Sequence, residues 1–413
     1  MNTIAKIIIL AFFLTACFKL TAMDIDPNGY LYGDVYLKSG SHYRGLIRWG
    51  KEEASWGDLF HSSKGEVTYK AYIPSECKKD KTIKVFGFKI ATKSWDAQIE
   101  RIFVARFGDI AEIRTVGTKS AEILMKSGRV YPVSGYSNDV SSKIMVQDES
   151  LGEILIPWQK LDKVVFADGK LQAGDFPSRI YGKVDTTEGS FEGFIQWDHD
   201  ECIGDDELDG ENDSGDFSIP FKNISTITKK SSSRVFVTMT DNRKLHLSGT
   251  NDVSKGNRGI YVDDPRFGKV DIPWRVFKHV EFKPQLSTGP SYSRYLTSKP
   301  LEGTVITKEK QSHHGFIAYD LDEMESWELL NGSYNEIGYI VPFNTISAIS
   351  PKTSYSCRVT LNDGTSFPLE DKADVSEKNL GILVLKHPED GEGIYTSWKN
   401  LAKINFDKAA PPH

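Results

Sequence analysis

The sequence is poor in cysteine and has no excess of basic residues. Only four of its 413 residues are cysteine, and no two of them have the C-x-x-C spacing of zinc and redox motifs. Lysine and arginine number 51 against 57 aspartates and glutamates, a formal net charge of −6. Because sequence-independent nucleic-acid binding needs a basic surface, we expect no nucleic-acid partner.

Long apolar runs and enzyme signatures are also missing. After the N-terminal segment, no apolar run reaches the roughly 18 residues that a membrane-spanning helix needs. The nine histidines show no H-E-x-x-H spacing, and the motifs G-x-S-x-G, G-x-x-x-x-G-K and G-x-G-x-x-G do not occur. No non-repeated set of acid, base and nucleophile is visible, so we expect a protein without catalytic activity.

Residues 1–22 have the pattern of an export signal. Lys6 precedes a short apolar run, Ile7–Leu14, and small residues follow it. A basic start, a short apolar centre and a small-residue end are typical of secretory signals, and this run is too short to span a bilayer. We therefore expect an exported protein, either free in the periplasm or outside the cell, or held at a membrane surface.

The end of this segment, Leu14-Thr15-Ala16-Cys17, resembles the signal of bacterial lipoproteins. The resemblance implies cleavage before Cys17, lipidation of Cys17, and membrane contact through that anchor only. Phe18 is not the aspartate associated with inner-membrane retention, so the resemblance favours the outer membrane of a Gram-negative host. Cleavage after Ala22, which would release a free protein, is the alternative.

Three cysteines remain beyond Cys17, namely Cys77, Cys202 and Cys357. An odd number cannot pair completely within one chain. We favour buried free thiols over a Cys202–Cys357 bridge, because free cysteine behaves as a small apolar residue.

Internal repetition is the strongest pattern in the sequence. Gly45-Leu46-Ile47-Arg48-Trp49 matches Gly193-Phe194-Ile195-Gln196-Trp197 and Gly315-Phe316-Ile317-Ala318-Tyr319. The spacing from Trp197 to Asp252 equals the spacing from Tyr319 to Asp374. The spacing from Trp49 to Asp139 is longer. Repeats of this length indicate an array of similar units. We predict repeats at 29–167, 178–283 and 294–408, with an insertion at about 65–100 in the first.

Each repeat also shows two similar halves. Ile219-Pro220-Phe221 closes the first half of repeat two and Ile272-Pro273-Trp274 closes the second. Alternating runs such as Val235–Met239, separated by turns, predict short strands. We therefore predict an all-β protein of tandem small β-barrels, two to each repeat, which resemble SH3-like or Sm-like barrels in strand number only. The recurring aromatic residues are expected to lie in the core.

Acidic residues recur after the first aromatic residue of each repeat. Asp198 and Asp200 alternate along the chain and could present oxygen atoms on one face. Oxygen ligands suit calcium, although acidic residues at strand ends are more often solvated turn formers. The candidate ligands in repeats two and three are Asp198, Asp200, Glu201, Asp205, Asp209, Asp320, Asp322 and Glu323.

The segment 205–216 places carboxylates at the positions of an EF-hand calcium loop. It departs from that pattern because position 3 is Glu207 and position 12 is Asp216, where aspartate or asparagine and glutamate are required. Asn212 replaces the apolar residue at position 8, and 217–221 reads as a strand. We favour a flexible acidic loop over a calcium site.

These observations predict a non-enzymatic envelope protein whose repeats bind an envelope protein partner or act as a spacer. We expect no cofactor other than calcium, whose binding by the acidic residues is left open. One alternative is a calcium-stabilised repeat protein. A second is an envelope glycan hydrolase that uses a carboxylate pair such as Asp198 with Glu201, or Asp322 with Glu323.

Overall fold

A computed structural model of the chain describes residues 27–65, 68–73, 75, 81–85, 88–93, 101–135, 139–169, 177–285 and 287–407. Their regular structure consists of β-strands and three-residue 3-10 turns, so the all-β prediction is confirmed. Among these residues, no helix has the length and apolar character that crossing a membrane requires. The predicted signal segment, Cys17 and Cys77 lie outside the described residues.

The strands of the first repeat are β1 (Tyr32–Leu37), β2 (His42–Trp49), β3 (Leu59–Lys64), β6 (Arg101–Arg106), β7 (Ile110–Thr115), β8 (Ser120–Met125), β9 (Val130–Ser134), β10 (Ile144–Asp148), β11 (Gly152–Ile156) and β12 (Leu161–Phe166). Within the predicted insertion, β4 (Lys81–Val85) and β5 (Phe88–Lys93) form an antiparallel pair of their own.

The strands of the second repeat are β13 (Tyr181–Thr186), β14 (Ser190–Trp197), β15 (Glu207–Asn212), β16 (Gly215–Pro220), β17 (Ile224–Ser231), β18 (Arg234–Met239), β19 (Lys244–Ser248), β20 (Ile260–Asp264), β21 (Gly268–Ile272) and β22 (Phe277–Phe282). Those of the third are β23 (Glu302–Thr307), β24 (Ser312–Ala318), β25 (Leu329–Tyr334), β26 (Ile337–Pro342), β27 (Ile346–Pro351), β28 (Ser356–Leu361), β29 (Ser366–Glu370), β30 (Ile382–Leu385), β31 (Ile394–Thr396) and β32 (Leu401–Phe406).

The three repeats have the same antiparallel strand order. In repeat two, the pairings give the order β16-β15-β19-β18-β17-β22-β13-β14-β20-β21. The same order holds in repeat one, from β6 to β11, and in repeat three, from β26 to β31. The internal repetition of the sequence is thus also a repetition of strand pairing.

The two halves of each repeat exchange strands. In repeat two, β13 and β14 come from the first half, yet their outer partners are β22 and β20 of the second half. Conversely, β18 and β19 of the second half pair with β17 and β15 of the first. Each five-stranded set therefore contains strands from both halves, and within the described residues the pairing stays open rather than closing into a barrel.

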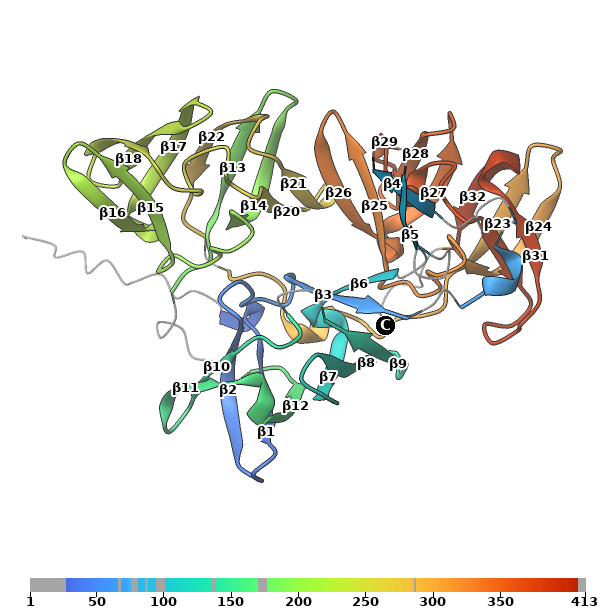
Figure 1. The fold of residues 1–413 in the computed structure, drawn as a ribbon, viewed down its shortest axis with the longest axis horizontal. Coiled ribbons are helices and arrows are strands. Elements are labelled where there is room, and N and C mark those ends of the chain that lie inside the picture. Colours follow the sequence, from blue (N-terminus) through green and yellow to red (C-terminus); the bar gives the residue numbers. More distant parts are fainter. Residues whose placement is uncertain are drawn as a thin grey trace, which may run out of the picture.

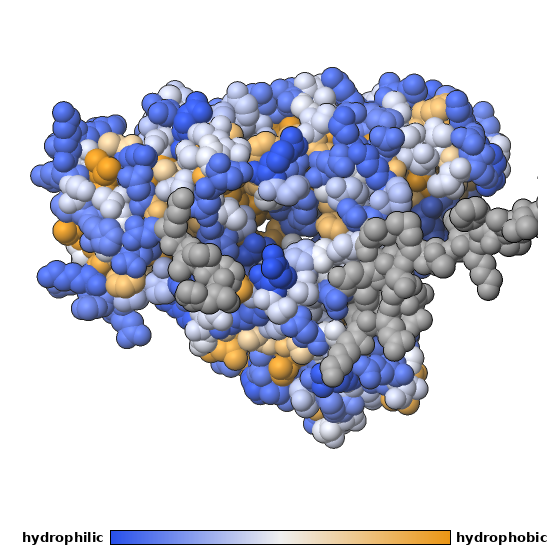
Figure 2. Space-filling model, turned by 180° about the vertical axis from the view of Figure 1, so that it is seen from behind, coloured by the Kyte–Doolittle hydropathy of each residue, from blue (hydrophilic) through white to orange (hydrophobic). Residues whose placement is uncertain are grey.

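Repeats two and three share one sheet, because β21 pairs with β26. Repeat one forms a separate sheet that lies below the other two in Figure 1. Seen from the opposite side, hydrophilic side chains cover most of the surface, and apolar side chains form scattered patches (Figure 2). The three repeats therefore meet around a common junction.

The recurring aromatic residues lie in the core, as predicted. Trp49 packs edge-on against Trp158 with ring centroids 6.2 Å apart, and Trp197 packs against Trp274 at the same distance. In repeat three, Tyr319 and Trp398 occupy these positions and are also buried. Such pairs contribute packing energy beyond the area they bury.

Candidate functional site

One aspartate holds the two halves of each repeat together, and it is buried in repeats one and two. The indole nitrogens of Trp49 and Trp197 donate to the carbonyl oxygens of Asp139 (2.9 Å) and Asp252 (3.0 Å), and the Tyr319 hydroxyl donates to that of Asp374. The Asp252 carboxylate in turn accepts from the backbone nitrogen of Asp209 at 2.8 Å. The recurring Asn-Asp-Val and Trp motifs therefore build the fold.

Asp198 and Asp320, predicted as metal ligands, lie buried in left-handed turns with φ of 51° and 52°. The Asp198 carboxylate accepts hydrogen bonds from the backbone nitrogen of Arg258 and the side-chain amide of Asn251. The Asp320 carboxylate accepts from the backbone nitrogen of Leu380. Both side chains thus tie one loop of their repeat to another.

The next residues of the acidic loops pair with basic side chains. Asp200 lies 3.1 Å from an Arg258 guanidinium nitrogen, and Asp322 lies 3.0 Å from the Lys64 ammonium of repeat one. The corresponding residue of repeat one, Glu52, lies 3.7 Å from Arg258 of repeat two. The acidic loops therefore take part in ion pairs within and between repeats.

Glu201 and Glu323 follow at the same position of their loops. Each has one buried carboxyl oxygen without a hydrogen-bond partner among the described residues. Burial, reinforced by Asp252, raises the pKa of Glu201 to about 9. Burial likewise holds the pKa of Glu323 well above its usual range. These shifts favour the neutral form of both carboxyls, which is a poor state for binding a cation.

The segment 205–216 is a β-hairpin rather than the flexible acidic loop that the sequence favoured. β15 and β16 pair from Glu207–Pro220 to Asn212–Gly215. The Asp209 carboxylate accepts from the Ser218 hydroxyl at 2.6 Å, and Asp205 lies 2.5 Å from the Lys222 ammonium. The expectation was wrong because the polar residues alternate along a strand whose inward positions, Leu208 and Gly210, face the core.

The structure does not bring the eight predicted ligands to one place, since they lie on the acidic loops of repeats two and three and, for Asp209, on strand β15. Among the described residues, two other groups place three potential ligand atoms within 4.8 Å of one another: Glu52 with Glu53 and Asp139, and Glu302 with His314 and Asp407. Neither group contains a predicted ligand. Cys202 and Cys357 are buried free thiols, as expected.

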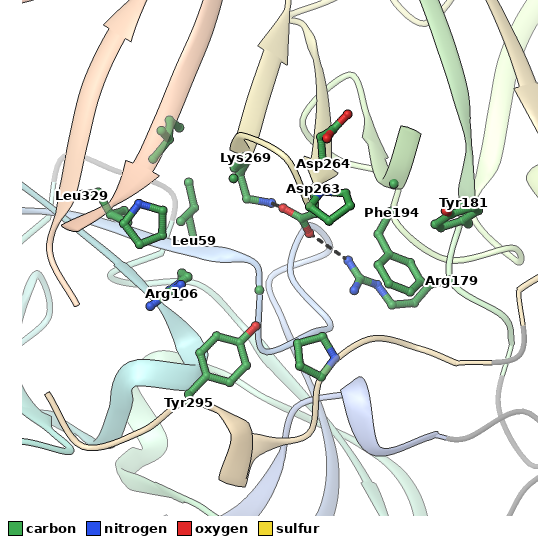
Figure 3. Close-up of a pocket in the computed structure, with 17 residues that line it drawn as sticks. Leu59, Arg106, Arg179, Tyr181, Phe194, Asp263, Asp264, Lys269, Tyr295 and Leu329 are labelled. Atoms are coloured by element: carbon green, nitrogen blue, oxygen red, sulfur yellow. Dashed lines mark ion pairs between the residues drawn. The ribbon is translucent and has the colours of Figure 1, made fainter. Parts of the chain in front are cut away.

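The junction of the repeats encloses a cavity of about 430 Å³. Repeat one contributes Leu59 and Arg106, and repeat three contributes Tyr295, Leu329 and Ile340. Repeat two provides the other side chains labelled in Figure 3, which are Arg179, Tyr181, Phe194, Asp263, Asp264 and Lys269. We call this space the junction cavity. Its size and mostly apolar walls are typical of ligand sites.

Arg179 is the central polar group of the junction cavity and is only 6% exposed. Its guanidinium lies 4.2 Å from the centre of the Phe194 ring, and one terminal nitrogen donates to the carbonyl of Thr288 at 3.1 Å. The other terminal nitrogen lies 3.5 Å from Asp58 and 3.6 Å from Asp263. Nε of Arg179 and Oδ1 of Asp58 have no hydrogen-bond partner among the described residues.

The remaining charges of the cavity are paired. Lys269 lies 2.7 Å from Asp263, and Arg106 lies 2.7 Å from Asp109 while its guanidinium faces the Tyr295 ring at 5.2 Å. Burial raises the pKa of Tyr295, which keeps its hydroxyl protonated. A fourth carboxylate of the lining, Asp264, lies 2.6 Å from Arg266. With Asp58 beside Arg179, four cations are thus paired with four carboxylates, and the charges around the cavity balance.

Gly57 keeps this space open. A Cβ atom there would stand 3.3 Å from both an Asp263 carboxylate oxygen and the Tyr295 hydroxyl oxygen. The described lining residues contain no histidine, cysteine or serine. The arrangement is therefore suited to holding a ligand.

The junction cavity is not predictable from a local sequence pattern, because its residues come from distant segments of the chain. One signal was available. Arg179, Tyr30 and Pro300 occupy the same position of the three repeats, where each forms an isolated bridge to the acidic loop. Repeat two has an arginine at this position, whereas the other repeats have tyrosine and proline. Packing within the repeat does not require an arginine there.

No known protein family matches this chain, and no curated protein is similar to it. Among solved structures, a streptogramin B lyase structure aligns over 85% of this chain and 99% of its own, with 9% sequence identity and a TM-score of 0.11. A TM-score this low carries no argument about fold or function.

Proposed function

We propose that this chain is an exported, non-catalytic binding protein of a bacterial envelope, and that its ligand occupies the junction cavity. The observation that carries the proposal is Arg179, a buried cation with an unpartnered Nε in a cavity lined by all three repeats. A buried donor without a partner costs about 1–3 kcal/mol, so a ligand acceptor at this atom would be favourable.

The chemistry of the cavity indicates the class of ligand. Arg179 offers a donor and Asp263 an acceptor, while Phe194 and Tyr295 offer ring surfaces. Because the charges of the cavity balance, a neutral ligand with hydroxyl or amide groups and an apolar face fits better than a strong anion. Small saccharides and dipeptides of the envelope belong to this class.

The proposal also states where the protein is located in the cell and from what kind of module its repeats are built. The signal-like segment supports export, and Cys17 supports lipid anchoring in the outer membrane, with a freely secreted form as the alternative. We further propose that each half repeat derives from a five-stranded SH3-like or Sm-like module whose strands have been exchanged with those of its neighbour. An envelope protein partner remains part of the proposal, whereas calcium is not, since the acidic loops have partners within the protein.

The binding test uses calorimetry and thermal shift with a panel of neutral disaccharides and dipeptides. Gly57→Val narrows the cavity and Arg179→Gln removes the central donor, while Arg234→Gln, on an exposed strand end, serves as the matched control. We expect a panel member to bind wild type and Arg234→Gln, with at least about tenfold weaker binding to both cavity variants. Binding that is unchanged in Gly57→Val, or the absence of any binder, would overturn the proposal.

A further inference from the structure

The junction between repeats two and three shows how one repeat attaches to another. Lys269, Val270 and Asp271 of β21 pair with Ile340, Tyr339 and Gly338 of β26. Phe191 and Phe267 of repeat two pack against Tyr339 of repeat three with ring centroids 6.4 and 5.9 Å apart, and Phe267 also lies 5.3 Å from Phe367. Phe191 and Tyr339 are thereby buried. We call the edge of repeat two at β21 the donor edge, and the edge of repeat three at β26 the acceptor edge.

The other repeats contain the corresponding strands. β11 corresponds to the donor strand β21, because Ile144–Ile156 and Ile260–Ile272 are equivalent pairs and both strands begin at a glycine with positive φ. β16 corresponds to the acceptor strand β26, because both pair in the same way with the preceding strand. Within the described residues, β11 pairs only with β10, and β16 only with β15.

The donor edge of repeat one has the apolar side chains that the junction requires. Tyr43 and Leu151 occupy the positions of Phe191 and Phe267. Leu151 is 68% exposed, and Leu155 of β11 is also exposed. In repeat three these positions are His313 and Gly391, so that donor edge lacks the apolar contact.

The acceptor edge of repeat two is likewise apolar and open. Phe217 and Leu245 occupy the positions of Tyr339 and Phe367, and both are only partly buried. In repeat one, the equivalent Phe103 and Tyr131 are covered by Trp327 of repeat three, with ring centroids 5.8 Å from each. Among the described residues, two apolar edges thus remain without a partner strand: the donor edge of repeat one at β11 and the acceptor edge of repeat two at β16.

We infer that β11 of one copy of this chain pairs with β16 of a second copy and repeats the β21–β26 junction between molecules. In the equivalent register, Ile154 stands opposite Phe217, Glu153 opposite Ser218 and Leu155 opposite Asp216, so no like charges face each other. β11 contains no lysine, proline or bulge that would protect an edge strand. Both edges lie on the outer side of the molecule at the left of Figure 1. The contact joins two different surfaces, so it forms a ring or an open chain.

The test measures the mass of the purified chain by light scattering and sedimentation over a wide concentration range. Leu151→Asp disables the donor edge and Leu245→Asp the acceptor edge. Leu296→Asp is the matched control, because Leu296 is 57% exposed and lies on neither edge. We expect wild type and Leu296→Asp to associate with rising concentration, and each edge variant to associate at least about tenfold more weakly.

Mixing the two edge variants gives the decisive result, because each retains the edge that the other has lost. We expect the mixture to form a one-to-one complex, which pairing of β11 with β11 could not produce. A wild-type chain that stays monomeric, or edge variants that fail to associate when mixed although both fold as wild type by circular dichroism, would overturn the inference.

Discussion

At the scale of single residues, the acidic loops illustrate how burial changes the role of a carboxyl group. Asp198 accepts backbone and amide hydrogen bonds and is fully buried. Glu201, three residues later, has no cation beside its buried oxygen and is held neutral. The sequence shows both as acidic residues after a strand. Only the packing around them separates a carboxylate that accepts hydrogen bonds from another loop from a buried carboxyl group with a raised pKa.

Glu201→Gln should stabilise the protein, and the gain should grow with pH. The folded state raises the pKa of Glu201 from 4.5 to about 9, so its contribution is fully present below pH 4.5 and is lost as the pH rises toward 9. Glutamine cannot ionise and avoids this loss. We expect a gain of about 1–2 kcal/mol at pH 8 and little at pH 4, after allowance for partial exposure.

Urea unfolding at pH 4, 6 and 8 measures this difference against Glu207→Gln, a change at an exposed glutamate of β15. A Glu201→Gln effect that is the same at all three pH values would contradict the account of the buried carboxyl.

Asp252→Ala should destabilise repeat two. The change leaves the backbone nitrogen of Asp209 without the carboxylate that accepts its partly buried hydrogen bond at 2.8 Å. The loss of one such hydrogen bond costs about 0.5–1.5 kcal/mol. Chemical denaturation of this variant beside Asp241→Ala, an exposed turn aspartate, measures the effect. Equal stability of the two variants would show that the aspartate does not hold the halves together.

At the scale of strands, the sequence predicted much of the local structure and missed the pairing partners. Alternation and turn residues predicted strands such as β18 (Arg234–Met239) and the recurrence of their order. The exchange between halves was not predictable, because alternation determines which side chains face the core and leaves the neighbouring strand unspecified. The acidic hairpin was misjudged because Leu208 and Gly210 are too few apolar residues to reveal a strand among carboxylates.

Strand exchange predicts that the two halves of repeat two fold only together. Fragments 178–231 and 234–283 would each lack the partners of their outer strands, since β14 pairs with β20 and β15 with β19. We expect neither fragment to show a cooperative thermal transition alone, and the mixture to regain one, as followed by circular dichroism. A cooperative transition of one isolated fragment would show that the half repeat is an independent module.

At the scale of the whole molecule, charged side chains hold the repeats against one another. Arg48 of repeat one makes two hydrogen bonds of 2.7 and 2.8 Å to the Asp206 carboxylate of repeat two. Lys64 of repeat one lies 3.0 Å from Asp322 and 3.5 Å from Glu328 of repeat three. These contacts connect repeat one to repeats two and three, and no sequence pattern indicated them because their partners are distant along the chain.

Lys64→Met should weaken the attachment of repeat one to repeat three. The change leaves Asp322 and Glu328 buried without their cation, and removing one partner of a buried ion pair costs about 3–5 kcal/mol. Calorimetric unfolding should show a lower melting temperature or a separate transition, compared with Lys352→Met at an exposed position. Melting curves that coincide would contradict a role for Lys64 between repeats.

Hydrogen–deuterium exchange is the most direct test for a ligand in the junction cavity, because it reports every segment that a ligand contacts or orders. The measurement compares the wild-type chain with and without the tightest-binding disaccharide or dipeptide. We expect slower exchange at the same ligand concentration in three separate segments, around Leu59, Phe194 and Ile340, which line one cavity from three repeats. Protection confined to a single repeat, or located away from these segments, would contradict this expectation.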